Sequence, residues 1–162
     1  MNGGGVLVAG IGNIFLSDDG FGVEVAARLG SEDLPAGVKV ADFGIRGVHL
    51  AYELLDGYDA LVLVDAVPMG EAPGTLAVLE PGPPGAGGVL DAHSMSPDVV
   101  LATLGRLGGR LERVLVVGCE PAGVEEGIGL SAPVAAAVEP AAKMCCQLAA
   151  ELLQPAGKGL RP

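Results

Sequence analysis

The chain has 162 residues, which suffices for one domain with a sizeable core and hardly for two. Half of the residues are apolar but only 3% are aromatic, so the core must be aliphatic; the many glycines and prolines lie between apolar runs, as turn residues do. The formal net charge of −11 repels phosphate backbones and argues against a nucleic-acid partner, while it remains compatible with a protein partner.

Apolar runs alternate with amphipathic segments in the first half of the chain. Three of these runs have the composition of buried strands, at residues 5–10, 38–43 and 60–67. Helical periodicity follows the first two runs, at residues 19–29 and 47–55. Asp18 and Asp19 stand at the start of the first helix, where acidic side chains suit the helix dipole.

The second half continues this alternation after a segment rich in proline and glycine. That segment, residues 68–88, is expected to be a surface excursion with one short strand at residues 75–79. Three elements follow it: a helix that Ser96 caps, a strand at residues 113–117, and a long alanine-rich helix that Ser131 caps and that reaches Leu153.

The order of these elements predicts a single α/β domain over residues 1–162, with residues 154–162 as a frayed tail. We expect a three-layer sandwich, in which helices cover both faces of a mostly parallel or mixed sheet of about five strands. In such folds, binding sites form beyond the carboxyl ends of the strands. Side chains that follow different strands can therefore meet there.

Several features favour a cytoplasmic protein. The first basic residue is Arg28, so the start of the chain does not resemble a signal peptide. Charged residues, glycine or proline interrupt every apolar stretch before it is long enough to span a bilayer. Cys119, Cys145 and Cys146 form no C-x-x-C pair, which favours free, buried thiols in a reducing compartment.

A glycine turn, Gly10-Ile11-Gly12-Asn13, follows the first expected strand. A dinucleotide-binding fingerprint needs a third glycine at position 15, and that residue is Phe15. The acidic pair at Asp18 and Asp19 would also repel a pyrophosphate. A plain tight turn is therefore favoured over a nucleotide site.

Two carboxylates and one imidazole are candidates for a mixed oxygen and nitrogen metal site. Asp65 ends the apolar run LVLVD, where a carboxylate is costly unless it is paired, solvated in a cleft or bound to metal. Asp19 follows the first strand, although a solvated first-turn residue is the simpler interpretation of it. His93 precedes the helix capped by Ser96, and a lone histidine is as often only a surface or core residue. Together the three would suit a divalent transition metal with open positions.

The segment VLVAGIGNIFLSDDGFGVEVAARL resembles the opening of the hydrogenase maturation proteases. The resemblance extends in order from Val6 to about Leu153, through DFGIRGVHLAYELL, LVLVDAV, APGTLAVLEP, HSMSPDVVLATL and VVGCEPAGVEEGIGLSAPVAAAVEPA. It implies that Asp19, Asp65 and His93 are the family's metal ligands. One departure is that Ser94 and Met95 follow His93, where related sequences often have glutamine and an apolar residue.

The resemblance also implies an activity. We expect an endopeptidase that removes the C-terminal extension of a nickel–iron hydrogenase large-subunit precursor after nickel insertion. The nickel is carried by the substrate, no organic cofactor is needed, and the metal or a carboxylate activates the cleavage. Two alternatives stay open: a non-catalytic metal- or partner-binding module of the same fold and, less favoured, a nucleotide-binding α/β protein.

Overall fold

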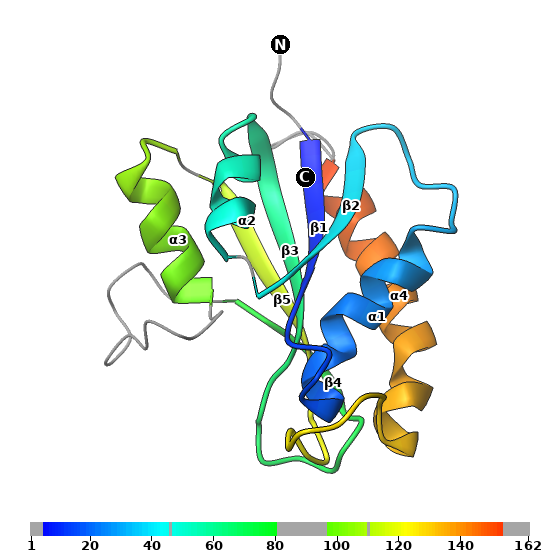
Figure 1. Cartoon of the computed structure of the whole chain (residues 1–162). Coiled ribbons are helices and arrows are strands. Elements are labelled where there is room, and N and C mark those ends of the chain that lie inside the picture. Colours follow the sequence, from blue (N-terminus) through cyan, green and yellow to red (C-terminus); the bar gives the residue numbers. More distant parts are fainter. Residues whose placement is uncertain (1–4, 46, 81–96, 110, 154–162) are drawn as a thin grey trace.

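A five-stranded sheet forms the centre of the computed structural model, which describes residues 5–45, 47–80, 97–109 and 111–153 (Figure 1). The strands, given with their bounds, are β1 (Gly5–Ile11), β2 (Val38–Gly44), β3 (Tyr58–Ala66), β4 (Leu76–Leu79) and β5 (Arg113–Cys119). Their order across the sheet is β2-β1-β3-β5-β4. The first four in this order run parallel, and β4 pairs antiparallel with β5 at the edge.

Helices cover both faces of this sheet. Their bounds are α1 (Phe21–Leu29), α2 (Gly47–Leu54), α3 (Pro97–Arg106) and α4 (Ala132–Leu153), and a short 3-10 helix, η1 (Ser17–Gly20), precedes α1. Helices α1 and α4 lie together on one face, and α2 and α3 lie together on the other (Figure 1). The three-layer sandwich with a mixed sheet that the sequence predicts is thus confirmed.

The core is divided between the two faces by the alternation of side chains along each strand. Val6 and Val8 of β1 pack into the cluster beneath α1 and α4, whereas Leu7, Ala9 and Ile11 pack into the cluster beneath α2 and α3. Because both faces are covered, β1 and β3 are apolar without the polar alternation of a half-exposed strand. Their continuous apolar runs therefore have a direct structural cause.

The chain reverses its direction of travel across the sheet at β1. It passes from β1 to β2 on one side of β1, and then returns past β1 to add β3 on the other side. The connections through α1 and α2 lie on opposite faces. At such a switch point a binding crevice is expected beyond the carboxyl ends of the strands, here those of β1 and β3. A functional site in a sheet of this kind belongs at this position.

Element boundaries differ from the sequence-based expectations by one or two residues in most cases. One of these differences has a structural reason, at the first helix, which is expected from residue 19. Here the chain first forms η1, and α1 begins only at Phe21. The cap predicted at Ser96, the tail at residues 154–162 and the excursion beyond residue 80 lie outside the described residues.

Other expectations from the sequence concern thiols and membranes. All three cysteines are free, with Cys119 and Cys145 buried and Cys146 half-buried. Across the described residues, no helix combines the length and apolar character needed to cross a bilayer.

Candidate active site

Asp65 lies at the predicted crevice, one residue before the end of β3 and in register with Gly118 of β5. The backbone N–H of Ala66 donates to its Oδ1 at 2.8 Å. Burial raises the pKa of this carboxyl group well above its ordinary value, and the charge of Asp19 raises the pKa further. The structure therefore agrees with the sequence argument that a charged carboxylate at this position is costly.

Asp19, in η1, lies close enough to Asp65 for its charge to act on that carboxyl group. The backbone N–H of Asn13 donates to Asp19 Oδ2 at 2.7 Å. Gly12, at φ +134°, permits this contact, because a Cβ atom there would lie 1.9 Å from the carbonyl oxygen of Asp19. The glycine turn thus holds a carboxylate of the same chain, which weighs against the nucleotide-binding alternative.

The two carboxylates form one electrostatic unit. Two nearby carboxyl groups disfavour simultaneous ionisation, and here burial and the charge of Asp19 raise the pKa of Asp65. A cation between them would reverse this balance by favouring both charged forms. The pair is therefore suited to hold a cation, and Asp65, with its raised pKa, is suited to act as a general base.

The third predicted ligand, His93, lies outside the described residues, so its place at this site remains a prediction. The other histidine, His49, is exposed on α2. In the described part of the chain, no group of three or more His, Cys, Asp and Glu side chains is arranged to hold a metal ion. The structure thus brings Asp19 and Asp65 together and leaves the metal set open.

A family model described as hydrogenase maturation protease matches residues 23–148. The chain belongs to the hydrogenase maturation protease family. The matched span contains Asp65 and begins four residues after Asp19.

Relatives and solved structures agree with this assignment. The chain is 34% identical to the hydrogenase 2 maturation protease of Escherichia coli over 140 residues, which are 84% of this chain and 85% of that protein. The structure of the hydrogenase maturating endopeptidase HybD from E. coli superposes with a TM-score of 0.78 at 30% identity, covering 91% of this chain and 93% of that one. The expected enzyme class, a peptide-bond hydrolase of hydrogenase maturation, is that of these relatives.

A third relative is longer than this chain. The hydrogenase expression/formation protein HupD of Rhodobacter capsulatus is 35% identical over 135 residues, which are 81% of this chain but only 64% of that protein. The chain therefore spans slightly less than two thirds of the length of that relative.

In this member of the hydrogenase maturation protease family, Asp18 has a role that the sequence did not reveal. Its side chain is buried, only 1% exposed, and accepts hydrogen bonds from the backbone N–H groups of Ala122, Gly123 and Ser131 and from Ser131 Oγ. Burial raises the pKa of Asp18, but these hydrogen bonds outweigh it and leave the pKa below its ordinary value. The Ser131 hydroxyl, expected to cap α4, donates to Asp18. No local pattern marks this role, because the donors lie 104 to 113 positions away.

Glu120 fixes a second loop at the same edge of the sheet. It follows β5, is buried, and accepts hydrogen bonds from the backbone N–H groups of Met69 at 2.5 Å and Glu71 at 3.2 Å. Its own backbone pairs with Thr75 and Gly74. Glu120 thereby holds the loop that follows Asp65.

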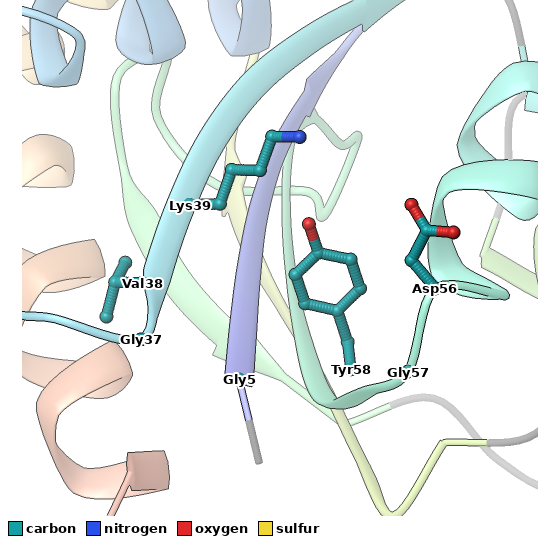
Figure 2. A pocket seen from close by; sticks show the side chains of 7 residues that line it. All are labelled: Gly5, Gly37, Val38, Lys39, Asp56, Gly57 and Tyr58. Atoms are coloured by element: carbon teal, nitrogen blue, oxygen red, sulfur yellow. The ribbon is translucent and has the colours of Figure 1, made fainter. Parts of the chain in front are cut away.

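A depression of about 400 Å³ lies at the opposite edge, near the amino ends of β1, β2 and β3 (Figure 2). Lys39 and Tyr58 line it, and both contact Glu53: Lys39 Nζ lies 2.8 Å from Glu53 Oε2, and Tyr58 OH donates to the same oxygen at 2.7 Å. These polar groups already have partners, and the carboxyl ends of the strands lie at the other edge. We therefore do not assign this depression to the chemistry.

Proposed function

We propose that this chain is the endopeptidase that removes the C-terminal extension of a nickel–iron hydrogenase large-subunit precursor after nickel insertion. Membership of the hydrogenase maturation protease family supports the reaction class. The observation that carries the proposal is the pair formed by Asp19 and Asp65 at the switch point of the sheet, where the charge of one raises the pKa of the other. The free thiols suit a cytoplasmic location, which is part of the same proposal.

The nickel in this scheme belongs to the substrate. Asp19 and Asp65, together with His93, would contact the nickel already seated in the precursor, because carboxylate oxygen and imidazole nitrogen are both ligands for a divalent transition metal. A cation also relieves the repulsion between the two carboxylates. Recognition of substrate-bound nickel would thus restrict cleavage to precursors that have received their metal.

Two chemical roles are compatible with this pair. A carboxylate with a raised pKa is matched to general-base work near neutral pH, so Asp65 would accept a proton from the attacking water. Alternatively, both carboxylates only position the metal, and the metal polarises the scissile carbonyl group or activates the water. In either case, Asp65 must carry a carboxylate.

Processing of a precursor by site variants tests the proposal. We expect the wild-type protein to shorten the nickel-loaded precursor and to leave the nickel-free precursor intact, as measured by mass spectrometry. Asp65→Asn, Asp19→Asn and His93→Ala should fold, as judged by circular dichroism, and leave the precursor uncut. Combining two of them should add little, since residues that act as a unit are strongly non-additive.

Asp59→Asn is the matched control, because Asp59 is an exposed aspartate at the other end of the same strand. It should cleave at the wild-type rate. Equal cleavage of nickel-free and nickel-loaded precursor would overturn the recognition scheme. A stable complex with the nickel-loaded precursor and no shortened product would instead identify the chain as a binding module.

A further inference from the structure

Two loops at the carboxyl edge of the sheet run side by side next to Asp19. Leu16 and Gly127 pair in an isolated parallel bridge. The N–H of Gly127 donates to the carbonyl oxygen of Phe15 at 2.9 Å, and the N–H of Ser17 donates to that of Gly127 at 2.8 Å. We call residues 13–17 and 122–129 the paired loops.

Asp18 fixes the paired loops to the candidate active site. Its carboxylate holds the second loop through Ala122 and Gly123, and its N–H donates to the carbonyl oxygen of Gly123 at 3.1 Å. Asp19 is the next residue in the chain. The position of the second loop relative to Asp19 is therefore set by buried, charge-assisted hydrogen bonds.

The paired loops expose large apolar side chains. Phe15 is 60% exposed and Ile128 is 79% exposed, whereas the other two phenylalanines of the chain, Phe21 and Phe43, are buried. Aromatic residues are scarce in this protein, and an exposed one contributes nothing to its core. Exposed apolar groups of this kind, beside a site that must receive a peptide, are typical of interaction surfaces.

A depression of about 350 Å³ lies beside Ile128. Ile128 and Leu130 give its lining an apolar part, and Asp18 and Glu125 line it as well. Its two serine hydroxyl groups already have partners, because Ser17 Oγ donates to the carbonyl oxygen of Glu125 and Ser131 Oγ donates to Asp18. An apolar side chain of a bound peptide would therefore contact Ile128 and Leu130 here.

We propose that Phe15, Ile128 and the adjoining depression form the docking surface for an apolar segment of the protein substrate next to the scissile bond. This inference rests on the proposed function, because it takes the substrate to be the hydrogenase precursor. The occupant follows from continuity, since the paired loops are hydrogen-bonded to the segment that carries Asp19. The surface supplies binding energy, and Asp19 and Asp65 supply the chemistry.

The test measures the affinity of the nickel-loaded precursor and its cleavage kinetics with surface variants. Phe15→Ser combined with Ile128→Ser should raise KM and the dissociation constant about tenfold, because burial of large apolar side chains is lost. The rate at saturating precursor should fall less than twofold, as expected for uniform binding. Ile128→Leu should retain the wild-type KM, because it keeps the apolar surface.

Tyr52→Ser is the matched control. Tyr52 is 55% exposed on α2, the helix that leads back to the amino ends of the strands. It should leave KM unchanged. A precursor with serine in place of the apolar residues around the scissile bond should bind the wild type and the double variant equally.

The outcomes separate this inference from the proposed function. Unchanged KM and affinity in the double variant, with normal cleavage by the wild type, would overturn the docking surface alone. Binding of the precursor by the wild type without cleavage would overturn the proposed function. The docking surface would then be supported if the double variant bound the precursor more weakly, and overturned if it did not. A lowered Tm in the double variant would show that these side chains stabilise the fold. A wild-type dimer that the double variant converts to monomer would assign the surface to a second copy of the chain.

Discussion

Asp18, Asp19 and Asp65 carry the same functional group in different environments. Four hydrogen bonds satisfy Asp18, and the pKa of its carboxyl group falls. Asp65, near the end of an apolar strand, accepts a hydrogen bond from the backbone N–H of Ala66, and its pKa rises through burial and the charge of Asp19. The first environment stabilises the charged form of Asp18 and thereby the folded state. The second environment disfavours the charged form of Asp65, as is common for a carboxyl group that binds a cation or takes part in a reaction.

The raised pKa of Asp65 predicts that Asp65→Asn stabilises the metal-free protein at neutral pH. The folded-state pKa lies above the ordinary value of 3.8, so ionisation of Asp65 opposes folding. The penalty is absent below that value, grows by about 1.4 kcal/mol for each pH unit up to the folded-state pKa, and is constant above it. Urea unfolding in EDTA, at several pH values, measures the difference between variant and wild type. A difference that does not shrink as the pH approaches 3.8 would contradict this explanation.

The lowered pKa of Asp18 predicts the opposite pH dependence. Its hydrogen bonds contribute stability that is fully present above the ordinary value of 3.8 and is lost as the pH falls through the lower folded-state pKa. Asp18→Asn should cost about 2 to 4 kcal/mol at pH 7, because an amide group then faces backbone N–H donors. The cost should shrink below pH 3.8. Asp33→Asn, at an exposed position, is the control and should change the free energy of unfolding little.

At the scale of elements, glycine decides how closely α1 approaches the sheet. A Cβ atom at Gly22 would lie 2.1 Å from the carbonyl oxygen of Val64 and 2.4 Å from that of Ile11. The backbone of α1 therefore rests directly on β1 and β3. This contact brings η1, and with it Asp19, beside the end of β3 that carries Asp65.

Two glycine-to-alanine variants separate packing from helix propensity. Gly22→Ala should destabilise the protein by about 3 kcal/mol or more, since the backbone atoms it meets cannot move aside without disturbing β1 and β3. Gly105→Ala, in α3, meets nothing within 4 Å and should stabilise by up to about 1 kcal/mol. Chemical unfolding of both variants measures these changes. Similar effects at the two positions would show that the close approach of α1 is not required.

At the scale of the whole molecule, one sheet separates two core clusters. Side chains of β1 and β3 contribute to both clusters, so neither cluster can lose its packing without affecting the strands of the other. This arrangement explains how one chain of this length forms a three-layer fold without disulfides. It also favours cooperative unfolding.

The single domain expected from the sequence therefore predicts one unfolding transition. Differential scanning calorimetry should give a calorimetric enthalpy equal to the van't Hoff enthalpy, and far-ultraviolet circular dichroism should give the same Tm. Two resolved transitions, or melting of the helices ahead of the calorimetric peak, would show that the two faces unfold separately.

The sequence by itself determined the order of strands and helices and the class of the fold. Hydrophobic periodicity is local, so runs such as residues 60–67 identify buried strands without knowledge of their neighbours. The sequence also singled out Asp65, because a carboxylate at the end of an apolar run is costly unless its surroundings pair it, solvate it or supply a metal. The rule that sites form at the carboxyl ends of strands then placed Asp19 at the same edge.

Only the tertiary structure decided what depends on distant residues. The hydrogen-bond donors to Asp18 lie more than 100 positions away, so the local pattern could not distinguish this buried anchor from a first-turn acid. The exposure of Phe15 was likewise undetermined, because an apolar residue in a loop is buried or exposed according to which segments fold over it. The loop closures and the helix packing on the sheet place Asp19 beside Asp65 and Phe15 beside Gly127. Such contacts form only when the whole chain folds.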